Sequence, residues 1–126
     1  MEEIRPVILV LDDDDSIRRS LARLFRALGL ESRSFASAGE LLASQRPEPP
    51  VCLLLDLQLP DMNGLDLLRW LRESGGILPV VVITGRLEEG LRERVLQAGA
   101  AGFLTKPFED ADLLAQIRCA LGQGGG

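Results

Sequence analysis

The feature that most constrains the fold of this chain is a series of apolar runs separated by amphipathic stretches. The runs lie at 7–11, 31–35, 51–55, 79–84 and 101–105, and the run at 31–35 is the weakest. Those at 7–11, 51–55 and 79–84 are apolar throughout instead of alternating with polar residues. This pattern is typical of strands that are covered on both faces, as in a parallel sheet.

Between the runs, apolar residues recur at helical spacing. One such stretch lies at 17–28, another follows a capping box at 37–40, and three more lie at 65–71, 87–98 and 113–121. We expect Gly75-Gly76 to close the third helix. Gly90 lies within the fourth predicted helix, where a glycine weakens helical structure.

The alternation of strands and helices with short connections predicts an α/β fold. Its core is a doubly wound, five-stranded parallel sheet with helices on both faces. In such a sheet, functional groups gather at the carboxyl ends of the strands, near the point where the winding reverses. We expect one domain over residues 1–121, followed by a flexible, glycine-rich tail at 122–126.

Composition narrows the kinds of function that the chain can have. The formal net charge is -5, which argues against direct nucleic-acid binding because phosphates repel an acidic domain. The absence of histidine excludes a Ser-His-Asp nucleophile and a histidine-ligated metal within this chain. No apolar run approaches a membrane span and the first residues lack a basic signal start, so we expect a soluble cytoplasmic protein with no membrane partner. Cys52 and Cys119 both lie in apolar runs and are predicted to be core thiols.

Polar side chains follow four of the predicted strands. Asp12 and Asp13 begin a run of four acids, Asp56 ends the third strand, Thr84 ends the fourth, and Lys106 follows the fifth. Because the carboxyl ends of parallel strands meet at one edge, we expect these groups to converge. Clustered carboxylates repel one another unless a cation binds, and oxygen ligands without histidine or cysteine favour Mg²⁺. With a lysine and a hydroxyl beside them, they predict metal-assisted phosphoryl transfer to an aspartate.

Purely structural roles account for some of these residues. Asp14 and Asp15 are interpreted as a helix N-cap and a first-turn acid that complements the helix dipole. Asp56 is different, because a charge placed directly after a buried run is costly without a partner. Lys106 is the only lysine among 14 basic residues, which indicates that this position requires a compact, movable ammonium.

Five motifs together carry a resemblance to a known family. They are VLDD at 10–13, LLDLQLPDMNG at 54–64, VITG at 82–85, AGA at 98–100 and FLTKPF at 103–108. In these motifs the chain, from about Pro6 to Leu121, resembles a response-regulator receiver domain of two-component signalling. It looks most like receivers that are coupled to helix-turn-helix transcription domains. The resemblance implies a flavodoxin-like strand order of 2-1-3-4-5.

The resemblance implies a role for each residue of the acidic site. Asp56 accepts a phosphoryl group from a sensor histidine kinase. Asp13 and Asp56 bind Mg²⁺ directly, and the main-chain carbonyl of Gln58 completes the protein ligands. Asp12 acts through a metal-bound water.

The resemblance also implies a switch. Thr84 and Lys106 contact the phosphoryl oxygens, Thr84 moves toward the phosphate, and the aromatic Phe103 turns inward with it. The Lys106–Pro107 bond is usually cis in this family. The surface of the fourth helix, fifth strand and fifth helix then changes and engages a second copy or an output domain. On it lie Glu88, Arg92, Glu93, Asp112 and Gln116.

Three further positions are expected to tune the reaction. Gln58 and Arg86 lie two residues beyond Asp56 and Thr84, at positions that control dephosphorylation in the family, and the small Gly85 leaves the site open. By this resemblance the chain is a signalling receiver that promotes its own phosphorylation and dephosphorylation. It is not expected to be an enzyme that turns over an external substrate.

Two alternatives stand beside this reading. The segment from Asp12 to Ser16 also fits the Asp-x-Asp-x-hydroxyl motif of haloacid-dehalogenase-like phosphatases, with Asp12 as nucleophile and Asp14 as acid. That assignment leaves Asp56 without a task, and no further acidic pair stands at a strand end after Lys106 to hold the metal. The other alternative is a receiver-like binding module that is never phosphorylated. The complete set of acids, threonine and lysine argues against it.

Overall fold

The computed structural model describes residues 6–45, 51–74, 78–86 and 88–122. Its centre is one five-stranded sheet in the order β2-β1-β3-β4-β5, in which every neighbouring pair is parallel. The strands are β1 (Val7–Leu11), β2 (Glu31–Phe35), β3 (Val51–Asp56), β4 (Val80–Thr84) and β5 (Gly102–Thr105). The predicted fold class and strand order are confirmed, and the predicted strand bounds agree to within one residue.

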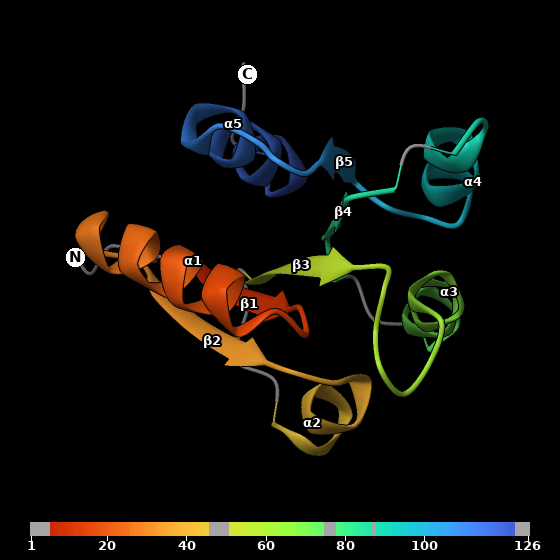
Figure 1. Ribbon diagram of the computed structural model, residues 1–126, viewed down its shortest axis with the longest axis horizontal. Coiled ribbons are helices and arrows are strands. Elements are labelled where there is room, and N and C mark those ends of the chain that lie inside the picture. Colours follow the sequence, from red (N-terminus) through yellow and green to blue (C-terminus); the bar gives the residue numbers. More distant parts are fainter. Residues whose placement is uncertain (1–5, 46–50, 75–77, 87, 123–126) are drawn as a thin grey trace.

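In the described residues four helices connect the strands and a fifth follows β5, and together they cover both faces of the sheet, as Figure 1 shows. They are α1 (Asp15–Ala27), α2 (Ala38–Ala43), α3 (Gly64–Glu73), α4 (Leu91–Gln97) and α5 (Asp110–Ala120). Helices α1 and α5 lie on one face, and α2, α3 and α4 lie on the other. None of the helices in the described residues is long and apolar enough to cross a membrane.

Each face of the sheet has its own buried cluster, because successive side chains of a strand point to opposite faces. In β1, Ile8 and Val10 pack with Phe25 of α1, whereas Leu9 and Leu11 belong to the cluster that includes Leu41 of α2. Strands β3 and β4 are buried at every position. Two-sided burial explains why these runs are apolar throughout instead of alternating.

The two cysteines have different surroundings. Cys52 of β3 is fully buried, as predicted, and burial raises the pKa of its thiol to about 12. Cys119 is exposed, so its predicted place in the core is wrong. Leu113 and Ile117, four residues apart, face the sheet from α5, and the helical repeat turns Cys119 away from that face.

Side-chain caps begin the first two helices as the sequence predicts. Asp14 is the N-cap of α1, where its carboxylate accepts from the amides of Ser16 and Ile17, and Asp15 lies in the first turn. At α2, Ser37 Oγ accepts from the amide of Glu40 at 3.2 Å. These contacts satisfy amides that have no partner within a helix.

Helix α4 begins later than its apolar pattern predicts. Gly90 has a φ of 79°, in the left-handed region, and stands as the N-cap residue before Leu91. The prediction that Gly90 lies within the helix is therefore wrong, because a left-handed residue cannot continue a right-handed helix. The other predicted helix boundary residues, Leu87 and Gly75-Gly76, lie outside the described residues, as does the predicted tail beyond Gly122.

Candidate functional site

Two acidic residues follow β1 directly and differ in exposure. Asp12 is fully buried, whereas Asp13 is exposed. Asp12 Oδ1 accepts from the amide of Asp14 at 2.9 Å, and Arg18 Nη1 of α1 donates to the Asp12 carbonyl at 2.7 Å. The Asp12 amide donates to the carbonyl of Phe35 at 3.2 Å. These bonds fix the acidic turn against both α1 and β2.

Asp56 is the last residue of β3 and is 3% exposed. Its Oδ1 accepts from the amide of Gln58 at 3.0 Å, so the chain turns immediately after the strand. The loop from 57 to 63 closes on itself, because the Gly64 amide donates to the Leu57 carbonyl at 3.1 Å. A Cβ at Gly64 would lie 2.5 Å from Leu57 Cα, so this closure requires glycine.

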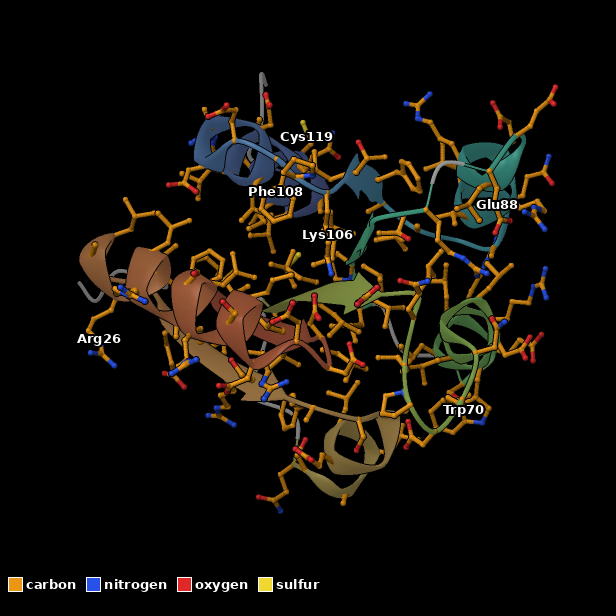
Figure 2. The ribbon with its side chains drawn as sticks, in the orientation of Figure 1. Arg26, Trp70, Glu88, Lys106, Phe108 and Cys119 are labelled. Carbon is orange, nitrogen blue, oxygen red and sulfur yellow. The ribbon has the colours of Figure 1, made fainter. Side chains whose placement is uncertain are left out.

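Lys106 joins the two buried carboxylates. It follows β5 and points toward the ends of β3 and β1, as Figure 2 shows. Its Nζ lies 2.8 Å from Asp12 Oδ2 and 3.2 Å from Asp56 Oδ2. The Lys106 amide donates to the Thr84 carbonyl at 2.8 Å, and the Lys106–Pro107 bond is cis, as expected. One ammonium is thus shared between residues from two strands.

Asp12, Asp13 and Asp56 each offer a carboxylate oxygen, and these oxygens all lie within 4.8 Å of one another. Burial raises the pKa of Asp56, and the charge of Asp12 raises it further, although the Gln58 amide and Lys106 oppose the rise. Two buried carboxylates therefore share one ammonium, and the exposed carboxylate of Asp13 lies beside them. A set of carboxylate oxygens without sulfur or nitrogen ligands fits Mg²⁺.

Partial burial alone lowers the pKa of Lys106, but its hydrogen bonds and the charges of Asp12 and Asp56 outweigh that effect and raise it. Lys106 therefore remains cationic at neutral pH. The Lys106 ammonium holds two carboxylates in place. A metal ion that neutralised part of the carboxylate charge would allow the ammonium to bind a third anionic group.

Thr84 ends β4 beside this cluster and is fully buried. In the sheet register Asp56 pairs with Ile83, and Thr84 pairs with Thr105 next to Lys106. Thr84 Oγ1 accepts from the amide of Arg86 at 3.1 Å. Its hydroxyl hydrogen can therefore be offered to an anion at the sheet edge.

The predicted switch and tuning residues lie around this edge. Phe103 of β5 is half-buried and lines a hollow with Arg86, Glu88 and Leu91. The Arg86 side chain pairs with Glu88 at 3.3 Å instead of pointing to a carboxylate of the cluster. The other two tuning positions are Gly85, which is exposed with open space where a side chain would lie, and Gln58, which is also exposed.

The structure brings Asp12, Asp13, Asp56 and Lys106 into one cluster and places Thr84 at its side. Sequence reasoning missed Arg18, whose bond to the Asp12 carbonyl buttresses the acidic turn. The signal was present, since an arginine three residues into a helix after a buried acid can reach back to the turn. Helical spacing alone does not show which of several arginines does so.

Comparison with known proteins agrees with this geometry. A family model for the response regulator receiver domain matches residues 8–118. The response regulator protein TodT of Pseudomonas putida is 38% identical over 121 residues, which cover 96% of this chain and 53% of that protein. The transcriptional regulatory protein FixJ of Azorhizobium caulinodans is 39% identical over 123 residues, which cover 98% of this chain and 58% of that protein. The chain thus spans about half the length of these relatives.

Solved structures give the same result. The response regulator StyR is 38% identical with a TM-score of 0.85, and the match covers 94% of this chain and 60% of that one. A CheY-like receiver domain protein from Methanospirillum hungatei is 32% identical with a TM-score of 0.84, covering 95% and 96% of the two chains. The resemblance seen in the motifs is therefore confirmed across the fold, the family model and the relatives. The chain belongs to the response-regulator receiver family and is a receiver domain of two-component signalling.

Proposed function

We propose that Asp56 is the phosphoacceptor of this receiver and that the reaction depends on Mg²⁺. The observation that carries the proposal is the shared ammonium, since Lys106 Nζ contacts both Asp12 and Asp56 within the carboxylate cluster. Asp12 is fully buried, and both of its oxygens are held at 2.8–2.9 Å. Both oxygens of Asp56 also accept hydrogen bonds, at 3.0 and 3.2 Å, so what favours Asp56 over the phosphatase-like use of Asp12 is its place in the receiver motif.

The donor set fits one divalent cation. Asp13, Asp56 and the main-chain carbonyl of Gln58 would hold it, with Asp12 acting through a water molecule. When bound, the ion supplies positive charge that offsets carboxylate repulsion and attracts phosphoryl oxygens. Asp56 is thereby kept ionised despite its burial, which is the form that an attacking carboxylate needs.

The proposed step is an in-line displacement at phosphorus. An Asp56 carboxylate oxygen forms the new P–O bond while the P–N bond to the imidazole of a kinase phosphohistidine breaks, and its electron pair leaves with the imidazole. Lys106 Nζ and the Thr84 hydroxyl donate to the phosphoryl oxygens as charge builds on them. The chain itself turns over no external substrate and acts as a signalling receiver.

The output of this step is proposed to be the surface of α4, β5 and α5. Recruitment of the Thr84 hydroxyl opens space for Phe103, and the packing of β5 and α4 changes with it. The residues of this surface are Glu88, Arg92, Glu93, Asp112 and Gln116. A second copy or an output domain would bind there, and the name of FixJ as a transcriptional regulatory protein supports an output that controls transcription. The charge of the domain argues against direct contact with nucleic acid.

The proposed domain extends over residues 1–121. The end of α5 at Ala120 supports this boundary, as does the left-handed Gly122 with a φ of 75°.

The phosphoacceptor is tested by intact mass after incubation with Mg²⁺ and a small acyl phosphate. We expect one phosphoryl adduct on the unsubstituted chain and on Asp66→Asn, an exposed acid outside the cluster, and none on Asp56→Asn. An adduct that survives in Asp56→Asn but is absent from Asp12→Asn would revive the phosphatase reading. No adduct on any chain, together with failure to bind a beryllofluoride mimic, would favour the binding-only module.

The output surface is tested by sedimentation with and without Mg²⁺ and beryllofluoride. If the surface mediates self-association, the mimic increases the sedimentation coefficient, and Arg92→Glu removes the increase. A mimic that binds without changing the sedimentation of either chain would leave an output domain as the occupant and contradict the homodimer.

A further inference from the structure

The carboxylate of Asp61 links two elements that are distant in sequence. Its Oδ1 accepts from the Ala38 amide at 3.1 Å, and its Oδ2 accepts from the Gly39 amide at 2.9 Å. Asp61 lies in the loop after β3, whereas Ala38 and Gly39 form the first turn of α2. Both carboxylate oxygens are used, so the contact restrains rotation of the side chain as well as its position.

This contact completes the first turn of α2. The Glu40 amide donates to Ser37 Oγ, and the two amides before it donate to Asp61. A six-residue helix has few bonds of its own, so a partner from another loop contributes much of its order. The two bonds, the Gly39 bond above all, hold the pKa of Asp61 below its ordinary range, which keeps the carboxylate charged.

The same loop begins at the candidate metal site. Its base is held by the bond from the Gln58 amide to Asp56 Oδ1, by the bond from Gly64 to Leu57, and by a bridge between Gln58 and Asn63. Its apex, three residues beyond Gln58, is held by Asp61 against α2. The position of the Gln58 main chain is therefore set from two sides, by Asp56 at the base and by α2 at the apex.

We propose that Asp61 is a positioning residue for the divalent-cation site, because it fastens the 57–63 loop to α2 and so fixes the main-chain carbonyl of Gln58. The inference rests on the proposed function only for the choice of Gln58 as a ligand. Asp61 lies outside the carboxylate cluster and acts through the loop. Its removal should weaken the cation site while leaving Asp12, Asp13 and Asp56 unchanged.

The test is a calorimetric Mg²⁺ titration without any phosphoryl donor. We expect Asp61→Ala to weaken Mg²⁺ binding by about tenfold, in line with the loss of other outer supports of metal ligands. Asp61→Asn keeps one acceptor oxygen, so its Mg²⁺ affinity should lie between those of the unsubstituted chain and Asp61→Ala. Asp66→Asn is the matched control, since it removes an exposed acid of similar chemistry without touching the loop contact. Hydrogen exchange at Ala38 and Gly39 should quicken in Asp61→Ala and stay unchanged in the control.

Three outcomes would overturn the inference. One is a lower melting temperature of Asp61→Ala with unchanged Mg²⁺ affinity, which would mean that the contact serves stability alone. Another is an equal loss of affinity in Asp66→Asn, which would mean that net charge is the cause. A third is no Mg²⁺ binding by the unsubstituted chain, which would also overturn the metal site. Because the titration uses no phosphoryl donor, a missing adduct at Asp56 would contradict the proposed phosphoacceptor and leave this result standing.

Discussion

At the scale of single residues, the main feature of the site is that two negatively charged carboxylates are buried close together. Asp12 and Asp56 are buried, and Lys106 is the one cation that contacts their carboxylates among the described residues. A buried carboxylate without a partner is costly, and two adjacent ones repel each other. The ammonium offsets part of this negative charge, and the proposed divalent cation would offset more of it. The stability of the domain and its proposed affinity for Mg²⁺ therefore depend on the same few groups.

Replacement of Lys106 should separate these two effects. In the absence of Mg²⁺, Lys106→Met is expected to destabilise the domain by about 2 kcal/mol, less than for a fully buried pair because water reaches the ammonium. Mg²⁺ should then raise the melting temperature of the variant by more than it raises that of the unsubstituted chain, since more negative charge is left to neutralise. Thermal melts with and without Mg²⁺ measure both the destabilisation by the substitution and the rise in melting temperature that Mg²⁺ causes. Equal Mg²⁺ increments in the two chains would contradict this account.

Asp61 gives a prediction for acid pH. Its pKa is lowered in the folded chain, so its bonds contribute stability above the unfolded pKa of about 4 and lose it as pH falls through the folded value. The stability difference between the unsubstituted chain and Asp61→Asn should therefore be constant from pH 7 to about 5 and shrink below about 4. Denaturant melts across this range measure the difference. A stability difference between the two chains that grows on acidification would contradict a lowered pKa of Asp61.

At the scale of elements, the sequence pattern predicts the strands, whose positions follow from burial. It does not predict the start of α4 or the contacts of Asp61, which depend on tertiary geometry. The apolar runs identify the strands because both faces of the sheet are covered. Gly90 shows the limit, since Leu91 and Val95 match helical spacing while the backbone angle that delays α4 leaves no periodic signal. Asp61 shows another, because its partners lie 22 and 23 residues upstream and no local rule identifies them.

The positions of polar residues at the strand ends predict the cluster from the sequence alone. Asp12, Asp56, Thr84 and Lys106 each stand where a run stops, and a parallel sheet sends all such ends to one edge. The individual contacts between Lys106 Nζ and the carboxylate oxygens cannot be predicted in this way. The sharing of Lys106 between two carboxylates depends on ångström-scale register, and no sequence spacing encodes it.

Gly90→Ala tests the start of α4. Replacing a glycine within a helix by alanine stabilises the fold by about 1 kcal/mol. The same replacement at a left-handed glycine destabilises it by about 1 kcal/mol or more. Because Gly90 has a φ of 79°, we expect destabilisation. Gly85→Ala is the control, since Gly85 has no positive φ and its side chain would meet open space. Stabilisation by Gly90→Ala in urea melts would place the glycine inside the helix.

At the scale of the whole molecule, the two thiols report on global opening. Cys119 is exposed, whereas Cys52 lies in the central strand β3 and its raised pKa leaves little thiolate at neutral pH. Access to Cys52 requires the sheet to come apart, because both of its faces are covered. A single chain thus carries one probe of its surface and one of its core.

Alkylation followed by intact mass should therefore show two kinetic phases. We expect one rapid adduct on the native chain and a second only on the timescale of global unfolding. Mg²⁺ should slow the second phase if it stabilises the fold. Cys119→Ser, the control, should lose the rapid phase and keep the slow one. Two rapid adducts on the native chain would contradict the burial of Cys52.

The long reach of the Lys106 contacts has one more consequence. The ammonium meets carboxylates 94 and 50 residues away, so no contiguous fragment short of nearly the whole domain holds the complete cluster. A chain that is half synthesised or partly unfolded has the acidic residues but lacks their assembled contacts with Lys106. With Asp56 as the proposed phosphoacceptor, only a copy that has finished folding would be able to receive a signal.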